Sequence, residues 1–275
     1  MSERFTPTPH FQQYLIVIKG AGDLASGVAY RLKRAGFPLL MTELPAPLFV
    51  RRTVAFGEAV YSGEIVIEGL PARRVSSSAE AQQMAYSTAI PVLVDPAATV
   101  VTELQPTILI DAIIAKRNLG TRLDDAPLVI ALGPGFTAGV DCHVVIETKR
   151  GHRLGRPIEQ GAAEADTGIP DLVNGIGTDR VLRAPTAGQV QPLVKIGDQV
   201  YNGQAVAQIG GITLYAPFAG TVRGLIHPSV TVTPGMKIGD LDPRDVVEHC
   251  FTISDKAFAI GGGVLEAILA SAIMR

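Results

Sequence analysis

The stretch Tyr14–Glu43, YLIVIKGAGDLASGVAYRLKRAGFPLLMTE, decides the fold expected for the first half of the chain. Its opening segment, Leu15–Ile18, is short, apolar and rich in β-branched residues, as in a strand buried on both faces. A glycine-rich turn follows, and helically spaced apolar residues then continue to Gly36, a residue suited to ending a helix. A second strand is expected at Phe37–Met41. This order predicts an α/β unit with buried parallel strands.

The turn between strand and helix has the pattern G-x-G-x-x-A, formed by Gly20, Gly22 and Ala25. In this context the pattern is the fingerprint of dinucleotide-binding turns. Gly20 permits the tight turn, Gly22 lets the backbone approach a phosphate, and Ala25 lets the helix lie close to the sheet. The helix N-terminus offers free N–H groups and the positive end of its dipole to an anion. We therefore expect nucleotide phosphates near Gly20, Gly22 and Leu24.

Two carboxylates bear on this expectation. Glu43 ends the second strand about 20 residues after the glycines, where an acidic side chain could bind a ribose hydroxyl. Asp23 directly follows the second glycine, where a carboxylate repels a pyrophosphate unless it points away or binds a metal or a base. The alternative interpretation is a glycine-rich turn that holds no ligand.

A second glycine-rich loop, containing Gly133, Gly135 and Phe136, follows the apolar strand expected at Leu128–Leu132. Parallel strands align their carboxyl ends, so both loops are expected at one edge of the sheet, the usual ligand crevice. The side chains expected to line this edge are Glu43, Arg51, Arg52, Asp111 and Lys116. The adjacent arginines could clamp a phosphate or a carboxylate, or could form a basic turn exposed to solvent.

Other features of the first half remain open between two interpretations. Gly63–Leu70 is expected as a hairpin or an excursion from the sheet. A polar set follows the second loop and consists of Asp141, His143, Glu147 and His152. Its spacing matches no standard metal-ligand motif, so we predict no metal site.

Composition and charge restrict the class of protein. The chain has 275 residues, which allows one or two domains, and its net charge of -2 gives no support for nucleic-acid binding. Cys142 and Cys250 lack metal-ligand or redox spacing, which indicates a reducing compartment. No apolar run reaches the length of a membrane span, and residues 1–13, expected as a flexible arm, contain no signal-peptide core. We therefore expect a cytoplasmic protein, and the sequence leaves homo-oligomerisation open.

The second half contains an internal repeat. Ala184–Val190 (APTAGQV) recurs as Ala216–Val222 (APFAGTV), and Val200–Gly203 recurs as Val232–Gly235 at the same offset of 32 residues. Short strands with glycine and proline turns predict a small all-β unit with two related halves.

The repeat resembles the biotinyl/lipoyl domain family, which implies a flattened barrel-sandwich fold over about residues 181–241. That family carries its modified lysine on the hairpin before the second A-P, which here is Ile209–Thr213. No lysine lies between Lys195 and Lys237. A biotinyl or lipoyl arm is therefore excluded at this hairpin, because the arm needs an amine to acylate.

The predicted fold class is thus α/β: a Rossmann-like parallel-sheet, nucleotide-binding domain over 14–160, then a barrel-sandwich domain over 181–241. A C-terminal helix over 254–275 is expected to pack back on the first domain. Three glycines, Gly261–Gly263, precede its apolar residues. They could form another anion-binding turn or a tight packing site.

The motifs together resemble one family. They are GAGDLASGVAYRLKRAGF, ELPAP, RRTVAF, GPGFTAGVDCHVVIETKRGHRLGR, the repeat, and ISDKAFAIGGGVLEAIL, and they extend from Tyr14 to the C-terminus. The chain is similar to the YqeB-type accessory proteins of the selenium-dependent molybdenum hydroxylase system. This resemblance implies a role in maturing such a hydroxylase, with the hydroxylase or its maturation factors as partners. It supplies neither a mechanism nor catalytic residues, so it leaves open whether the protein is an enzyme.

Three functions follow from these observations. The leading hypothesis is an accessory protein that binds a small phosphorylated ligand, such as a nucleotide or a molybdopterin dinucleotide. The second is an NAD(P)-dependent oxidoreductase, against which Asp23 and the lack of an obvious acid/base pair count. The third is a non-catalytic scaffold whose β module docks the hydroxylase.

Overall fold

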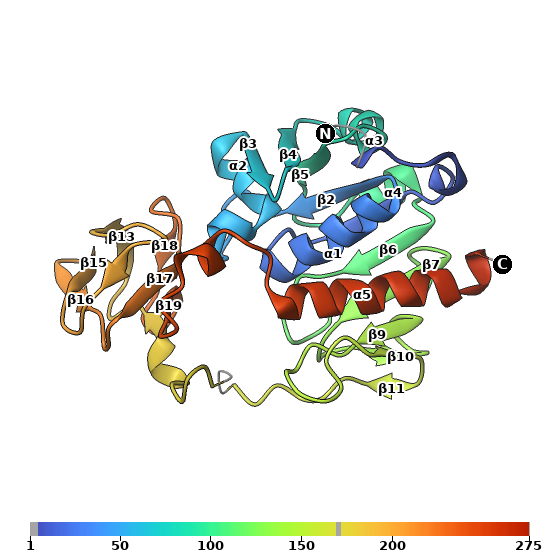
Figure 1. The fold of residues 1–275 in the computed structure, drawn as a ribbon. Coiled ribbons are helices and arrows are strands. Elements are labelled where there is room, and N and C mark those ends of the chain that lie inside the picture. Colours follow the sequence, from blue (N-terminus) through green and yellow to red (C-terminus); the bar gives the residue numbers. More distant parts are fainter. Residues whose placement is uncertain (1–4, 169–171, 275) are drawn as a thin grey trace. The chain divides into compact units, whose positions relative to one another are not determined.

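The computed structural model describes residues 5–168 and 172–274, which form two compact units. Within these residues, unit 1 comprises 5–45, 56–166 and 253–274, and unit 2 comprises 46–55, 167–168 and 172–252. The chain therefore leaves unit 1 after the second strand, returns to it, and closes it with the C-terminal helix. Figure 1 shows the elements of each unit.

Unit 1 contains a nine-stranded sheet in the order β10-β9-β7-β6-β1-β2-β5-β4-β3. Its strands are β1 (Ile16–Lys19), β2 (Leu39–Glu43), β3 (Glu64–Ile67), β4 (Leu70–Val75), β5 (Ile90–Val94), β6 (Ile108–Asp111), β7 (Leu128–Leu132), β9 (Val144–Ile146) and β10 (Pro157–Ile158). A separate two-stranded sheet joins β8 (Thr137–Ala138) to β11 (Gly161–Ala162). Neighbouring strands from β4 to β9 in this order are parallel, whereas β3 and β10 pair antiparallel at the two edges.

The predicted fold class, a Rossmann-like parallel sheet followed by a barrel-sandwich, is wrong. The large sheet is mixed because the Gly63–Leu70 segment forms a hairpin, in which Glu68 and Gly69 both have positive φ at a two-residue turn. The short strand β10 adds a second antiparallel edge. The repeat region forms two separate four-stranded antiparallel sheets.

Helices cover both faces of the large sheet. They are α1 (Asp23–Ala35), α2 (Ala59–Ser62), α3 (Ser78–Ala85), α4 (Val100–Leu104) and α5 (Asp255–Ala270), with short 3-10 turns at Pro9–Phe11, Phe56–Glu58 and Ala272–Met274. Strand residues alternate between two apolar clusters: Ile16 and Ile18 join the cluster of α1 and α5, and Val17 joins that of α3 and α4. This period of two places each strand between two helical layers.

Close backbone contact joins α1 to α5, which lie side by side in Figure 1. A Cβ added to Gly27 would lie 2.6 Å from the Cβ of Ala257, and one added to Gly261 would lie 2.8 Å from the oxygen of Gly27. The three glycines lie inside α5, whose N-terminus Ser254 caps by accepting a hydrogen bond from the Ala257 N–H. Of the two interpretations, tight packing is therefore the one the structure supports, and the anion-binding turn is wrong.

The expected flexible arm is packed from Phe5 onward. The Phe11 ring stacks on Phe37 with centroids 4.1 Å apart, and Phe5 is buried with its edge against Tyr30. The Thr8 N–H also donates to the oxygen of Gly36. Aromatic contacts of this kind bury enough surface to order a short terminal segment.

Unit 2 has two four-stranded antiparallel sheets, in the orders β12-β19-β17-β14 and β16-β15-β13-β18. The strands are β12 (Val181–Arg183), β13 (Gly188–Pro192), β14 (Gln199–Val200), β15 (Ala205–Ile209), β16 (Ile212–Tyr215), β17 (Gly220–Leu225), β18 (Thr231–Val232) and β19 (Lys237–Asp242), with 3-10 turns η3 (Arg52–Val54), η5 (Thr178–Arg180) and η6 (Val247–Cys250). Strands β13 and β17 begin at equivalent positions of the repeat, as do β14 and β18. Each half contributes to both sheets, because β13 pairs with β18 and β17 pairs with β14.

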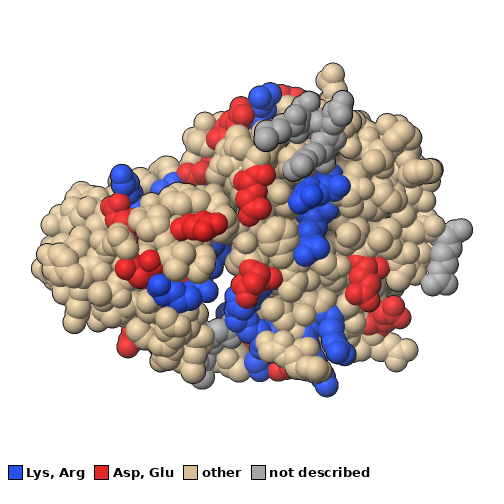
Figure 2. Space-filling view, in the orientation of Figure 1, with Lys and Arg blue, Asp and Glu red and all other residues tan. Residues whose placement is uncertain are grey.

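Two further features of the described residues are the character of their helices and the distribution of their surface charge. Among the described residues, no helix has the length and apolar character that crossing a membrane requires. Lys and Arg side chains alternate with Asp and Glu over the face seen in Figure 2 and form no single basic field there.

Candidate functional site

The candidate site lies where the parallel strands of unit 1 end. Strand β1 is in register with β2 and β6, with Lys19 opposite both Thr42 and Asp111, and β7 pairs with β6 so that Asp111 faces Ala131. The loops that begin at Gly20 and Gly133 therefore leave the same edge of the sheet. They flank the loop that follows β6. We call this region the carboxyl edge.

The first loop makes a tight turn into α1. Gly20 has φ 89°, which favours glycine, and a Cβ there would lie 3.1 Å from the oxygen of Ala112. The helix begins at Asp23, and no side chain caps its N-terminus at Gly22. Leu24 packs against the core partly buried, and Ala25 is fully buried. The sequence prediction of a strand, a tight glycine turn and a helix is thus confirmed locally.

Glu43 connects the end of β2 to this turn. Its Oε2 accepts from the Ala21 N–H at 2.9 Å, and its Oε1 accepts from the Leu44 N–H at 2.7 Å. Burial raises the pKa of Glu43 above its ordinary value, while both N–H groups act in the opposite direction. The Glu43 carboxylate therefore holds the glycine turn against the end of β2 through hydrogen bonds. This structural role differs from the predicted binding of a ribose hydroxyl.

A buried polar chain lies between the two loops. The Lys19 ammonium donates to the Thr121 hydroxyl at 2.5 Å, and that hydroxyl donates to Asp111 Oδ2 at 2.6 Å. Lys19 Nζ is also 3.5 Å from Asp111 Oδ2, and all three residues are buried. Sequence reasoning named Asp111 but missed Lys19 and Thr121. The lysine that ends an otherwise apolar strand was the available signal.

The second loop requires glycine at two positions, because neighbouring parts of the chain leave no room there for a side chain. A Cβ on Gly133 would lie 2.5 Å from Thr148 Oγ1, and one on Gly135 would lie 2.5 Å from the backbone of Arg117. Phe136 is buried in the core cluster of α3 and α4, so its side chain does not line the edge. Lys116 pairs with Asp166 at 2.7 Å.

Arg51 and Arg52 belong to unit 2, so the structure does not group them with the glycine loops of unit 1. Arg51 donates to the oxygen of His249 at 3.1 Å, and Arg52 donates to the oxygen of Leu225 at 2.9 Å. The prediction that they line the same edge as Glu43, Asp111 and Lys116 is therefore not supported within either unit. It stays a prediction, because the chain crosses into unit 2 at residue 46.

Three residues of the polar set after the second loop, Asp141, His143 and Glu147, have hydrogen-bond partners within the protein. Asp141 accepts from the Thr137 N–H and from Asn118, and His143 Nδ1 accepts from the Val129 N–H. Glu147 accepts from the N–H groups of Lys149 and Glu164. Within residues 5–168 and 172–274, no three His, Cys, Asp or Glu side chains are grouped as metal ligands.

Comparison with known proteins supports the resemblance to YqeB-type proteins. The chain is 53% identical over 255 residues to a protein of Escherichia coli strain K12 called uncharacterized protein YqeB. The match covers 93% of this chain and 47% of that protein, so the chain spans about half the length of its relative. No protein-family model matches the chain.

Three solved structures resemble the chain remotely. A succinylglutamate desuccinylase from Silicibacter sp. TM1040 has 11% identity and a TM-score of 0.25, covering 84% of this chain and 85% of that one. An aspartoacylase family protein from Mesorhizobium loti has 11% identity and a TM-score of 0.26, with 84% of each chain covered. A succinylglutamate desuccinylase/aspartoacylase from Rhodobacter sphaeroides has 13% identity and a TM-score of 0.25, covering 84% and 86%. Scores of this size transfer neither a fold nor an activity.

Proposed function

We propose that the carboxyl edge binds the phosphate groups of a small nucleotide-type ligand. The observation that carries this proposal is that α1 follows β1 through a glycine turn and has no side-chain cap at Gly22. An uncapped N-terminus of a 13-residue helix presents N–H groups and a positive dipole end to an anion. The ammonium of Lys19, which is paired with Asp111 in the polar chain beside the turn, supplies N–H donors at the same edge.

The two glycines of the turn differ in what they require. Gly20 needs glycine for its positive φ, whereas Gly22 has φ -69° and ψ -176°, a conformation that any residue adopts. A side chain at Gly22 is therefore tolerated by the backbone. It would, however, occupy the space through which a phosphate reaches the helix N-terminus.

Replacement of Gly22 tests the site, because valine can adopt the backbone conformation found there. We expect Gly22→Val to weaken the binding of ADP, GDP, CDP or NAD, whichever binds the wild type, by about tenfold or more in titration calorimetry. Gly262→Ala, on an open position of α5, is the matched control and should bind as the wild type does. Equal affinities for Gly22→Val and wild type would contradict the proposal. Failure of all four nucleotides to bind the wild type would favour the docking scaffold.

We further propose that this ligand site serves the maturation of a molybdenum hydroxylase, with a molybdopterin dinucleotide or another nucleotide as the ligand. The support is the sequence resemblance to YqeB-type accessory proteins. Deletion of the gene in the source organism should lower hydroxylase activity and cofactor content, and the wild-type gene should restore both. Native mass spectrometry of protein purified from that host would weigh the bound ligand. Normal hydroxylase activity after deletion would exclude this role and leave nucleotide binding to be judged by the Gly22 experiment.

A further inference from the structure

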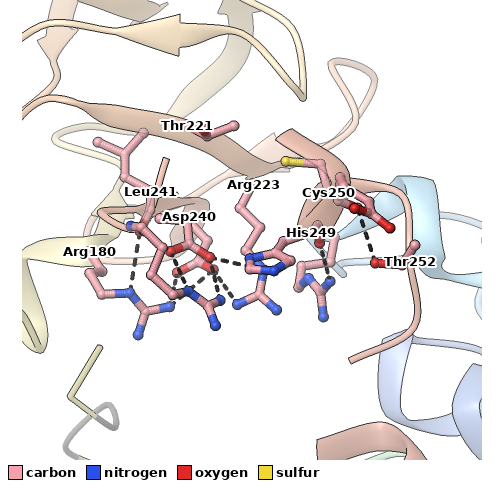
Figure 3. A network of polar contacts seen from close by, with 12 residues as sticks. Arg180, Thr221, Arg223, Asp240, Leu241, His249, Cys250 and Thr252 are labelled. Carbon is pink, nitrogen blue, oxygen red and sulfur yellow. Dashed lines mark hydrogen bonds and ion pairs between the residues drawn. The ribbon is translucent and has the colours of Figure 1, made fainter. Parts of the chain in front are cut away.

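Unit 2 buries a group of charged side chains on one of its sheets (Figure 3). Arg223 lies on β17, and Asp240 and Asp242 lie on the neighbouring strand β19. Arg180 ends the turn η5, and His249 lies in the turn η6, which packs against β17. These residues are more than 60 positions apart at the extremes, so folding alone brings them together.

The two aspartates have other arginines as their nearest partners. Arg244 donates to both oxygens of Asp242, at 2.9 and 2.5 Å. Arg180 donates to both oxygens of Asp240, at 3.3 and 3.4 Å. Burial acts to raise the pKa of Asp242, but the hydrogen bonds from Arg244 hold it at about 2. Both carboxylates thus already accept hydrogen bonds from arginines other than Arg223.

Arg223 makes only long contacts to the same carboxylates. Its Nη1 is 4.0 Å from Asp240 Oδ2, and its Nε is 3.7 Å from Asp242 Oδ2, both beyond hydrogen-bonding distance. The side chain is only 11% exposed. Among the described residues, the buried Nε of Arg223 has no hydrogen-bond partner. A guanidinium presents five donors, and leaving one of them without a partner in a buried site is costly.

A second buried nitrogen of this cluster also lacks a hydrogen-bond partner among the described residues. Within the described part of the chain, Nδ1 of His249 has no hydrogen-bond partner. The turn η6, which carries His249, packs against β17, which carries Arg223, and Figure 3 labels both residues in one network of polar contacts. The next residue, Cys250, donates from its thiol to the oxygen of Val222, which fixes this turn beside Arg223.

The local charge opposes the Arg223 guanidinium. Burial, followed by the neighbouring charge of Arg51, lowers the pKa of Arg223 below its usual value, and Arg244 acts in the same direction. Asp240 and Asp242 offset this only in part. A ligand that complements such a site carries negative charge and several acceptor oxygens.

We propose that unit 2 holds a binding site for a tetrahedral oxyanion, in which Arg223 and His249 are the principal ligands. The chemistry fits inorganic phosphate, sulfate or molybdate, and equally the terminal phosphate of an ester. Arg223 supplies a planar pair of donors, and His249 supplies one ring nitrogen. The site consists of side chains of unit 2 and is separate from the carboxyl edge, so either site can be absent without affecting the other.

Titration of the full chain with anions tests the site. We expect phosphate, sulfate or molybdate to bind the wild type one to one in calorimetry at constant ionic strength, with chloride as the reference anion. Arg223→Met should weaken that binding by about tenfold or more, because it removes charge-assisted hydrogen bonds. This variant is expected to fold, since it removes a poorly partnered buried cation and leaves both aspartates bonded to Arg180 and Arg244. Comparison of the three anions with phosphoserine distinguishes a free oxyanion from an ester.

A spectroscopic measurement on the wild type gives a result that does not depend on whether the Arg223→Met variant folds. The imidazole signals of His249, assigned by their loss in His249→Gln, should shift when the bound anion is added. Arg122→Met, which breaks an exposed pair with Asp124, is the matched control and should bind the anions normally. Absence of binding by all three anions and phosphoserine, or equal affinity in Arg223→Met and wild type, would overturn the proposal. Binding without any change at His249 would overturn its role as a ligand.

Discussion

Lys33 in unit 1 and Arg223 in unit 2 are both buried cations, and the two units accommodate them differently. Lys33, on α1, is fully buried and donates to the oxygen of Ala85 at 2.8 Å. Burial lowers the pKa of Lys33 to about 7, so the amine can lose its proton near neutral pH. An arginine keeps its proton in proteins. Arg223 therefore remains charged in unit 2, beside Asp240 and Asp242. Lys33 can instead be neutral in unit 1.

The units also differ in what holds them together. Both large apolar clusters consist of unit 1 residues, and glycines bring α5 into backbone contact with α1 and with the loop at Gly155. The sheet of β17 and β19 in unit 2 instead buries arginines against aspartates. Apolar packing is insensitive to pH and intolerant of added volume, whereas ion pairs depend on pH.

The largest expected effect is that of removing the Lys33 amine. Between about pH 7 and 10.5 the unfolded chain binds a proton at Lys33 that the folded chain does not, so stability should rise with pH. The rise from this group is about 4 kcal/mol over that window. Lys33→Met should be more stable than the wild type at pH 7 and should lack this slope in urea unfolding. Lys237→Met, on an exposed residue, should keep the slope. A wild type equally stable at pH 7 and pH 10 would contradict the shifted pKa.

The next effect concerns the glycines of α5. A Cβ on Gly263 would overlap the backbone oxygen of Gly155, so Gly263→Ala should lower the free energy of unfolding by about 3 kcal/mol. At Gly262 the nearest atom, on the Arg31 side chain, is 3.9 Å away. Gly262→Ala should therefore raise stability by up to about 1 kcal/mol through helix propensity. Equal stabilities of the two variants would show that α5 does not pack as described.

The smallest effect is the acid sensitivity of unit 2. The pKa of Asp242 is about 2 in the folded chain, against an ordinary value of 3.8. A lowered carboxyl pKa stabilises the fold above pH 3.8, and the benefit is lost as the pH falls toward 2. The loss is about 2 kcal/mol and should be smaller in Asp242→Asn, measured by unfolding between pH 5 and 2. Asp124→Asn, in an exposed pair, should follow the wild type. Identical acid profiles for Asp242→Asn and wild type would remove the ion network as a source of stability.

Local features were readable from the sequence alone. The strand at β1, the tight Gly20 turn, the helix ended by Gly36 and the 32-residue repeat all follow from residues close together in the chain. A turn that needs positive φ, or a helix that needs a stop, is decided by the few residues that form it. The common edge of the two glycine loops also followed, because parallel strands share an orientation.

Tertiary structure decided the features that join distant residues. Local sequence patterns did not predict four features of the fold. These are the mixed sheet, the assignment of 46–55 to unit 2, the hydrogen bond of Glu43 to the glycine turn, and the packing of α5 on α1. The same holds for Lys33 and Arg223, whose neighbours lie more than about 15 positions away. Burial and charge pairing depend on which segments meet, and one sequence without its fold does not specify that. Local backbone chemistry therefore determined the turn at the carboxyl edge, and only the folded chain assembled the arginines and aspartates of unit 2.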